Sequence, residues 1–170
     1  MPIEIERKFL PANDAWRARV ARSQRMAQGY LNDARAVREG AQNVSMRVRI
    51  AGQDAHLNLK SRELGAYRQE FEYPIPLADA EALLALCVGG CIEKLRHHVR
   101  HGAHEWEIDE FFGENAGLVV AEIELSAVDE EFEKPDWLGA EVTDKPRYYN
   151  LTLAERPYSQ WTSEEKTACS

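Results

Sequence analysis

Apolar and polar side chains alternate along most of this chain, beginning with the IEIERKF stretch near the N-terminus. Alternation with a period of two places one set of side chains on each face of a β-strand. Turn-forming residues separate the alternating runs, which favours consecutive antiparallel hairpins. We predict strands in the segments IEIERKF, MAQGYL, SMRVRI, HLNLKS, RQEFEYPI, CIEKLRHHV, HEWEIDEFF and LVVAEIEL.

Helical periodicity is limited to a few short segments. We predict helices in AWRARVARSQR, LADAEALLAL, SAVDEEFEK and NLTLAER. Residues 32–43 are predicted to form a long, mobile hairpin connection. The final segment has no amphipathic period and is predicted to be flexible. The chain is therefore expected to form one tunnel-like domain over residues 1–155, followed by a flexible tail over residues 156–170.

The composition is ordinary for a globular protein, with 44% hydrophobic and 29% charged residues in 170. No apolar run approaches the roughly 20 residues of a membrane span, and the N-terminus lacks a signal-peptide pattern. A formal net charge of -8 argues against nonspecific nucleic-acid binding. We expect a cytoplasmic protein without membrane or nucleic-acid partners, and the sequence leaves its oligomeric state open.

The polar faces of the predicted strands carry mostly one sign of charge each. Same-face neighbours on a strand lie about 6.5–7 Å apart, so like charges repel unless an opposite charge or solvent screens them. A solvated strand face explains any single pair of like charges. The recurrence of such pairs from strand to strand favours an interior that the charged faces share. The same-face sets are Glu4, Glu6 and Lys8; Arg47 and Arg49; His56, Asn58 and Lys60; Glu70 and Glu72; Lys94 and Arg96; Glu107 and Asp109; Glu122 and Glu124.

Closing an eight-stranded antiparallel sheet leaves an interior wide enough for side chains or one small ligand. If the charged faces point inward, this interior has a basic and an acidic sector. Arg and Lys bind phosphate oxygens, whereas carboxylates bind hard divalent cations. We therefore predict an α+β fold dominated by β structure, a closed eight-stranded antiparallel β-barrel with a few flanking helices that holds a metal-dependent polyphosphate site.

With these motifs, the chain resembles the CYTH family of triphosphate tunnel metalloenzymes over roughly residues 3–155. A single ExExK motif is a weak signal, but eight motifs in the same order are specific. The matching motifs are ExExK at Glu4, Glu6 and Lys8; RxR at Arg47 and Arg49; LK at Lys60; RxExE at Arg68, Glu70 and Glu72; KxR at Lys94 and Arg96; WEID ending at Asp109; AEIEL with Glu122 and Glu124; and the closing WLGAEVTDKPRYYN.

The resemblance implies a tunnel that binds a triphosphate on its basic side and Mg²⁺ or Mn²⁺ on its acidic side. The short bacterial single-domain members look most similar, and they hydrolyse inorganic tripolyphosphate to pyrophosphate and phosphate. The implied protein is thus a hydrolase, an inorganic triphosphatase (tripolyphosphatase), and its implied partner is a small-molecule triphosphate.

The resemblance also implies roles for individual residues. The implied metal ligands are Glu4, Glu6, Glu122, Glu124 and Asp109. The implied substrate-binding residues are Arg47, Arg49, Lys60, Lys94, Arg96 and Arg147. The implied catalytic residues are Lys60 with Tyr30, as a dyad that helps to deprotonate the attacking water, and Lys8 near the terminal phosphate.

Several alternatives remain open from the sequence. Tyr30 is equally explained as a packed barrel tyrosine, and the loop 32–43 could cover one tunnel mouth or alter which substrate enters. The proline in DKPRYYN leaves open whether Lys145 or Arg147 reaches the phosphates. The rival activities are nucleoside or thiamine triphosphate hydrolysis and, with less support, class IV adenylate cyclisation. The non-enzymatic rivals are a polyphosphate-binding module and a structural barrel with solvated charges.

Overall fold

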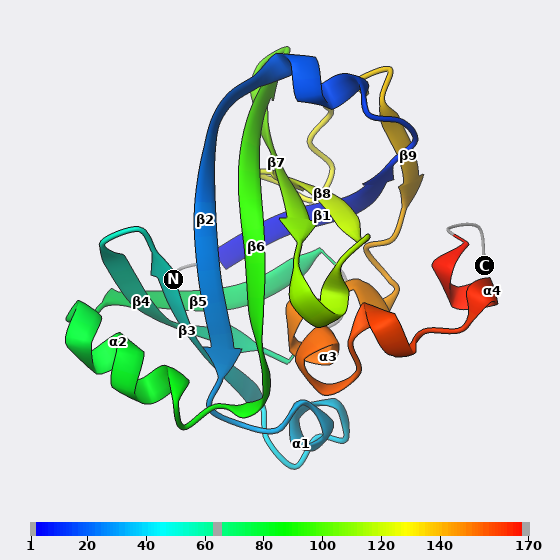
Figure 1. Cartoon of the computed structure of the whole chain (residues 1–170). Helices are drawn as coiled ribbons and strands as arrows, with labels where there is room; N and C mark the ends of the chain where they lie inside the picture. The colour runs from blue at the N-terminus through cyan, green and yellow to red at the C-terminus, as the bar shows by residue number, and fades with distance from the viewer. Residues whose placement is uncertain (1–2, 63–65, 168–170) are drawn as a thin grey trace.

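The computed structural model describes residues 3–62 and 66–167, and nine β-strands are found in this part of the chain (Figure 1). The strands are β1 (Ile3–Pro11), β2 (Val20–Tyr30), β3 (Val44–Ala51), β4 (Asp54–Ser61), β5 (Tyr67–Pro74), β6 (Val88–His101), β7 (His104–Phe111), β8 (Val119–Glu124) and β9 (Leu138–Glu141). All eight predicted strands are present. The four-residue β9 is an addition that the alternation did not predict.

The strands form one antiparallel sheet in the order β5-β4-β3-β2-β6-β7-β8-β1-β9. A further pairing of β5 with β1 closes the sheet, because β1 pairs with β5 near its start and with β8 further along. Ile3 lies opposite Gln69 in the first pairing, and Glu6 lies opposite Glu124 in the second. The predicted closed eight-stranded barrel is therefore confirmed, with β9 paired to β1 as one extra strand.

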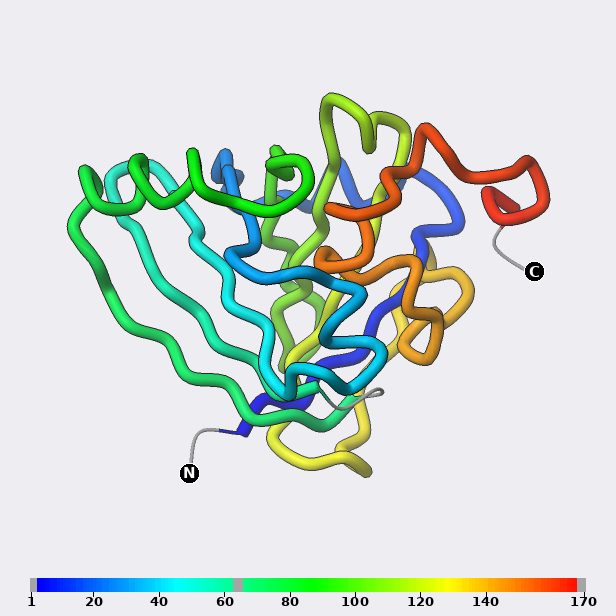
Figure 2. Tube along the Cα trace, turned by 90° about the horizontal axis from the view of Figure 1, so that it is seen from below, coloured from blue at the N-terminus to red at the C-terminus, as the bar shows by residue number. Residues whose placement is uncertain are grey.

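The helices are short, and the fold is dominated by β structure, as predicted. They are η1 (Ala15–Arg19), α1 (Ala34–Arg38), α2 (Leu77–Leu84), η2 (Gly113–Asn115), η3 (Pro146–Tyr148), α3 (Asn150–Glu155), η4 (Tyr158–Gln160) and α4 (Ser163–Lys166), where η marks a 3₁₀ helix. The helices expected in LADAEALLAL and NLTLAER are α2 and α3. In the two views, α2 lies along the outer side of β3 and β4 (Figures 1 and 2). The hydrophobic side of α2 buries Ala80 against Val48.

Two predicted helices are wrong. AWRARVARSQR is helical only in η1, and from Val20 onward the chain is β2, hydrogen-bonded along β6. The Ala and Arg residues of this segment favour helix locally, but pairing with a long neighbouring strand outweighs that weak preference. SAVDEEFEK forms turns, because Glu130 accepts hydrogen bonds from the backbone N–H of Ser126 and from its hydroxyl. Glu130 also pairs with His104 of β7.

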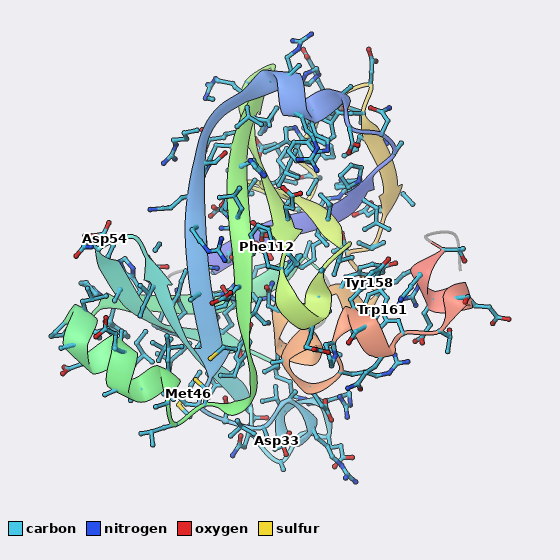
Figure 3. All side chains as sticks on the ribbon, viewed as in Figure 1. Asp33, Met46, Asp54, Phe112, Tyr158 and Trp161 are labelled. Carbon is cyan, nitrogen blue, oxygen red and sulfur yellow. The ribbon has the colours of Figure 1, made fainter. Side chains whose placement is uncertain are left out.

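Residues 156–167, which we predicted to form a flexible tail, contain η4 and α4. Trp161 is buried, and its ring packs edge-on against Tyr148 and Tyr158, each at 5.0 Å between centroids (Figure 3). The following helix α4 begins with a capping box between Thr162 and Glu165. Burial of the Trp161 side chain thus stabilises a segment whose sequence has no amphipathic period. Residues 168–170 lie outside the described part of the chain.

The loop 32–43 is also more ordered than a simple hairpin connection. It contains α1, whose Asp33 cap accepts a hydrogen bond from the backbone of Arg35. Ala34 and Val37 of α1 are buried.

Across the described chain, the helices are all too short to cross a bilayer.

Candidate active site

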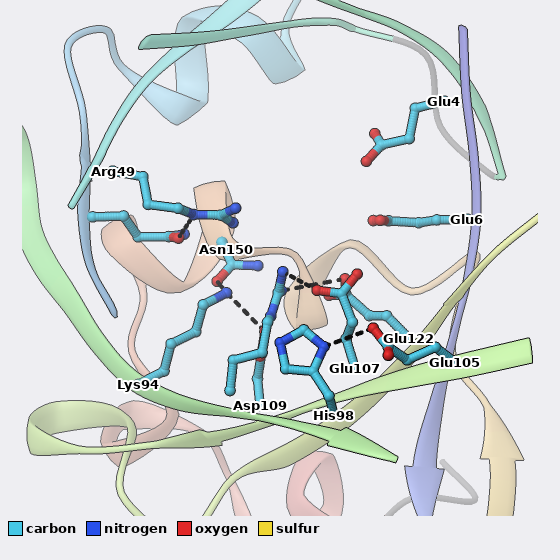
Figure 4. Close-up of polar contacts among 12 residues, drawn as sticks. Glu4, Glu6, Arg49, Lys94, His98, Glu105, Glu107, Asp109, Glu122 and Asn150 are labelled. Carbon is cyan, nitrogen blue, oxygen red and sulfur yellow. Dashed lines mark hydrogen bonds and ion pairs between the residues drawn. The ribbon is translucent and has the colours of Figure 1, made fainter. Parts of the chain in front are cut away.

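The barrel encloses a cavity of about 820 Å³, and most of the predicted charged faces meet there. Glu4 and Glu6 project into it from β1, while Arg49 projects from the opposite wall (Figure 4). The predicted site residues that line the cavity are Glu4, Glu6, Lys8, Tyr30, Arg47, Arg49, Lys60, Arg96, Glu122 and Glu124. Lys94, Asp109 and Arg147 are not among the lining residues.

The basic sector is formed by Arg47 and Arg49 on β3 with Arg96 on β6. Arg49 donates from Nε to Gln28 Oε1 at 3.1 Å, and no carboxylate of residues 3–62 or 66–167 forms an ion pair with it. Burial, reinforced by the nearby charges of Arg47 and Arg96, lowers the pKa of Arg49 to about 9. Within the described residues, Arg49 thus adds positive charge to the basic sector without a carboxylate partner of its own, which is an arrangement suited to an anionic ligand.

Arg47 reinforces this conclusion. Its side chain is only 7% exposed, and Glu70 lies 4.0 Å from it. Among the described residues, its buried Nε has no hydrogen-bond partner. An unsatisfied buried donor is costly, so such groups call for an explanation. A phosphoryl oxygen entering the cavity would supply the missing acceptor.

The acidic sector is held together by two lysines. Lys8 Nζ lies 3.0 Å from Glu6 Oε1 and 2.7 Å from Glu122 Oε1. Lys60 Nζ lies 2.9 Å from Glu4 Oε2. Burial disfavours the charged form of Lys8, but Glu122 and Glu6 outweigh it and raise the pKa of the ammonium. Both lysines are therefore bound to carboxylates.

Carboxylates outnumber these lysines in the acidic sector. Burial raises the pKa of Glu4 to about 8, and the neighbouring Glu6 carboxylate adds to the shift. Burial also raises the pKa of Glu124, with further contributions from Glu107, Glu6 and Glu70. Within residues 3–62 and 66–167, the glutamates that line the cavity are Glu4, Glu6, Glu70, Glu72, Glu107, Glu122 and Glu124.

This oxygen-only set is the type that Mg²⁺ and Mn²⁺ select. Within the described residues, however, no three acidic, histidine or cysteine side chains are arranged around one possible metal position. The ammonium group of Lys8 lies between Glu6 and Glu122 instead. The residues fit a divalent cation in their chemistry, and the predicted ligand set remains a prediction.

Asp109 lies apart from the glutamates that line the cavity. It is opposite Arg96 in the β6–β7 register, and the Arg96 guanidinium donates to both of its oxygens at 2.8 and 2.9 Å. Lys94 Nζ donates to Asp109 Oδ2 at 2.7 Å and to Asn150 Oδ1 at 3.3 Å. Both Lys94 and Asp109 are fully buried, so the structure places them where they support Arg96 and not where they reach the open cavity.

Arg147 is also placed differently from its predicted role. Its guanidinium carbon lies 5.0 Å from the ring centroid of Tyr148 and 5.7 Å from that of Trp161. Pro146 begins η3 just before it, and the residues after this turn that line the cavity are Tyr149 and Asn150.

Tyr30 and Lys60 both line the cavity, and their action as a dyad remains a prediction.

The sequence interpretation gave no role to several lining residues. Arg68, Glu70 and Glu72 belong to the RxExE motif, so their alternation on β5 was a usable signal. Tyr149 lies in the bend before α3 and Asn150 begins α3. Both belong to the closing motif WLGAEVTDKPRYYN, but the sequence interpretation gave neither side chain a role.

Two histidines near the β6–β7 turn, His97 and His98, are buried on β6. His97 hydrogen-bonds to Ser23 and Glu110, and His98 to Glu105. Their ring nitrogens are thus used in separate cross-strand contacts.

The fold and cavity together define a closed β-barrel whose interior can hold a polyanion between a basic and an acidic sector. The chain belongs to the CYTH domain family, which matches residues 2–158.

Two relatives extend this comparison. A protein of Acetivibrio thermocellus named inorganic triphosphatase is 41% identical over 159 residues, 93% of this chain and 97% of the relative. A protein of Nitrosomonas europaea with the same name is 34% identical over 156 residues, 89% of this chain and 96% of the relative.

Solved structures share the architecture. The crystal structure of an inorganic triphosphatase aligns with a TM-score of 0.62 at 31% identity, covering 91% of this chain and 95% of that one. A protein from Pyrococcus horikoshii aligns with a TM-score of 0.52 at 19% identity, covering 74% of this chain and 81% of that one. The second likeness shows the fold alone.

Proposed function

We propose that this protein is an inorganic triphosphatase that hydrolyses tripolyphosphate to pyrophosphate and phosphate inside the barrel. The observation that carries the proposal is that one cavity encloses the glutamate-rich acidic sector and Arg49, which has no carboxylate partner in the part of the chain that the structure describes. Two relatives with this activity in their names align over nearly the whole chain and support the assignment.

The chemistry follows from the distribution of charge. Phosphoryl transfer depends mainly on positioning the reactants and neutralising the charge on the transferring and leaving oxygens. Arg47, Arg49 and Arg96 would bind the leaving pyrophosphate through their forked donors. Asp109 keeps the Arg96 guanidinium in a fixed orientation through two hydrogen bonds. Tyr30 and Lys60 are the proposed pair that takes a proton from the attacking water.

Glu4, Glu6, Glu122 and Glu124 are the proposed holders of Mg²⁺ or Mn²⁺. A bound divalent cation would supply Lewis-acid stabilisation of the phosphoryl oxygens. Burial raises the pKa of Glu124, and repulsion from Glu107, Glu6 and Glu70 adds to the shift; this supports the location, since a cation would relieve the repulsion. The same arrangement supports a small-molecule triphosphate as the partner. The cytoplasm is the proposed compartment.

A second candidate is the hydrolysis of an organic triphosphate, such as a nucleoside or thiamine triphosphate. One part of the cavity wall is apolar, with Ala34 and Val37 from α1 and Leu151 from α3. An organic group attached to the terminal phosphate could pack there. No comparable observation favours adenylate cyclisation. A binding module without catalysis would use the same basic sector. A measurement of turnover distinguishes such a module from an enzyme.

The test is phosphate release by the purified full-length protein from tripolyphosphate, ATP and thiamine triphosphate in Mg²⁺, Mn²⁺ or EDTA. We expect metal-dependent turnover that is fastest on tripolyphosphate. A preference for ATP or thiamine triphosphate would select the organic alternative. Tight binding of tripolyphosphate without turnover in either metal would select the binding module.

A further inference from the structure

Helix α1, in the segment 32–43 that links β2 to β3, forms part of the cavity wall. Ala34, Val37 and Arg38 of α1 line the cavity, and so does Leu151 of α3. The two helices lie side by side at one end of the barrel (Figures 1 and 2). Ala34 and Val37 are buried there. The segment is therefore built into the end of the cavity and is more than a surface connection.

An ion pair joins α1 to α3. Arg38 Nη1 lies 2.8 Å from Glu155 Oε2, and Arg38 Nη2 donates to Glu155 Oε1 at 3.5 Å. Arg38 is the last residue of α1, and Glu155 is the last residue of α3. Both side chains are partly exposed, so the pair should change an equilibrium by no more than roughly fivefold.

A second arginine holds α1 from the barrel side. Arg62 follows the last residue of β4, and it donates from Nε to the backbone oxygen of Val37 at 2.8 Å. Its Nη2 donates to the backbone oxygen of Arg38 at 3.3 Å. The last carbonyl groups of a helix have no partner inside the helix, so these bonds satisfy two of them. The C-terminal end of α1 is thus fixed to the barrel.

The base of the segment is fixed as well. Asn32 donates from Nδ2 to Gln42 Oε1 at 2.8 Å and to the backbone oxygen of Val44 at 2.7 Å. Asn32 Oδ1 accepts from the backbone N–H of Met46 at 2.9 Å. These bonds join the two sides of the segment where it leaves β2 and enters β3. The position of α1 is therefore determined from both of its ends.

This end of the cavity differs from the charged sectors in what it offers to a phosphoryl group. The side chains of Ala34, Val37 and Leu151 are apolar. The guanidinium groups of Arg38 and Arg62 donate to Glu155 and to the backbone of α1. A phosphoryl group at this end would have to displace those contacts or lose its hydration against apolar side chains, and both are costly.

We propose that α1 is a specificity-determining end wall, held against α3 by the ion pair between Arg38 and Glu155, that restricts the cavity to short polyphosphates. This inference rests on the proposed function and deepens it. Tripolyphosphate binds between the basic and the acidic sector, and the further phosphoryl groups of a longer chain meet α1. A longer chain is accepted only when α1 moves away from α3, so its turnover depends on how firmly α1 is held.

The test compares kcat/KM for tripolyphosphate with kcat/KM for tetrapolyphosphate and for a long-chain polyphosphate. Arg38→Gln and Glu155→Gln should each raise the value for the two longer substrates roughly two- to fivefold, because each weakens the hold on α1. The value for tripolyphosphate should stay within about twofold. The double variant should match either single variant, since both substitutions remove the same contact.

The matched control is Glu39→Gln, the same change of side chain in an ion pair that does not reach α3. Glu39 Oε1 lies 2.9 Å from Arg35 Nε in an exposed pair next to α1. Glu39→Gln should leave the ratio of tetrapolyphosphate to tripolyphosphate turnover unchanged. A loss of stability alone affects all substrates together, so this ratio separates the end wall from a structural role. Thermal unfolding of every variant accompanies the kinetics.

A larger change removes the wall itself. Replacing residues 33–43 by a short glycine-containing turn keeps the connection between β2 and β3 and deletes α1. This variant should raise the ratio of tetrapolyphosphate to tripolyphosphate turnover roughly tenfold or more, since no helix has to move before a longer chain binds. If this variant fails to fold, the two glutamine variants decide the result.

The outcomes distinguish this inference from the function on which it rests. A wild-type protein that does not hydrolyse tripolyphosphate contradicts the proposed function. An active wild type whose substrate ratio is unchanged in Arg38→Gln and Glu155→Gln overturns the inference and leaves the function standing. Slower turnover of the longer chains in Arg38→Gln also overturns it, because Arg38 would then bind those chains. So does a wild type that hydrolyses tetrapolyphosphate as fast as tripolyphosphate.

Discussion

The ammonium group of Lys8 lies between two carboxylates, with its shorter contact, 2.7 Å, to Glu122 Oε1 and its longer contact, 3.0 Å, to Glu6 Oε1. The side chain of Lys8 is 5% exposed and that of Glu122 is 9% exposed. Lys8 thus offsets the repulsion between the buried Glu122 carboxylate and the largely buried Glu6 carboxylate. It contributes positive charge at a place where a divalent cation would also supply it.

The first prediction concerns the Lys8→Met variant. Without the ammonium group, Glu6 and Glu122 face each other uncompensated, which is costly for buried charges. Mg²⁺ should therefore raise the melting temperature of Lys8→Met more than that of the wild type, because a ligand of the folded state stabilises it. Thermal unfolding with and without Mg²⁺ measures this effect.

The matched control is Arg7→Met on the adjacent position of β1. Arg7 pairs with Glu141 in a partly exposed ion pair outside the cavity. Its loss should cost no more than about 1 kcal/mol and should leave the response to Mg²⁺ unchanged. Equal Mg²⁺ responses in Lys8→Met and wild type would contradict the location of the metal beside Glu6 and Glu122.

The second prediction concerns Asp109→Asn. Asp109 is fully buried and accepts hydrogen bonds from Arg96 and Lys94. The substitution removes the carboxylate that pairs with buried Lys94 and leaves Arg96 with Glu107 and Glu122. Removing one partner of a buried ion pair costs about 3–5 kcal/mol. We expect a loss of this order at pH 7, measured by urea unfolding. A loss below about 1 kcal/mol would show that the buried pair does not form.

The pH dependence of Asp109→Asn has a defined sign. Burial alone would raise the pKa of Asp109, but Arg96 and Lys94 outweigh burial and hold it below the ordinary value of 3.8. A carboxyl group with a lowered pKa stabilises the fold above its unfolded-state pKa and loses this contribution as the pH falls through the folded-state pKa. Wild-type stability should therefore fall more steeply below about pH 4 than that of Asp109→Asn.

The third prediction concerns Gly29, which precedes Tyr30 on β2. A Cβ atom at this position would lie 2.4 Å from Cys87 Sγ and 3.0 Å from Cys87 Cβ. Gly29→Ala should therefore destabilise the protein by about 1–3 kcal/mol through overpacking. The double variant Gly29→Ala/Cys87→Gly removes the clashing atoms and should recover most of this loss. Additive losses in a double-mutant cycle would contradict the close contact.

The fourth prediction concerns the C-terminal segment. Trp161 is 5% exposed and packs on Tyr148 and Tyr158, so Trp161→Ala should cost about 3 kcal/mol in the free energy of unfolding. Tyr73→Ala is the control, because Tyr73 is 53% exposed. Chemical denaturation measures both variants. A similar, small effect of the two substitutions would restore the original expectation of a flexible tail.

The barrel and much of the cavity lining could be predicted from the sequence because a strand places its side chains on alternating faces. Glu4 and Glu6 on β1, or Arg47 and Arg49 on β3, must therefore share a face wherever the strands close into a barrel. The position of Asp109 could not be predicted in this way. Its partner Arg96 is set by the cross-strand register, which alternation within one strand does not specify.

The remaining differences come from tertiary contacts that override local preference. The segment after Arg19 has a helix-favouring composition, yet it pairs with β6 along its length. Tyr149 follows a 3₁₀ turn, where no periodicity indicates which side chain faces the cavity. Trp161 is held by two aromatic rings, and a single large side chain leaves no periodic signal.

The most direct test of the central claim is the product balance of tripolyphosphate hydrolysis by the wild type, Glu6→Gln and Arg49→Gln, with Mg²⁺ and with EDTA. The account predicts equal amounts of pyrophosphate and phosphate from the wild type, no turnover in EDTA, and a loss of about 100-fold or more in kcat/KM in each variant, because each removes charge stabilisation of the transferred or leaving group. Wild-type turnover that persists in EDTA would contradict the account. So would a kcat/KM in both variants equal to that of the wild type.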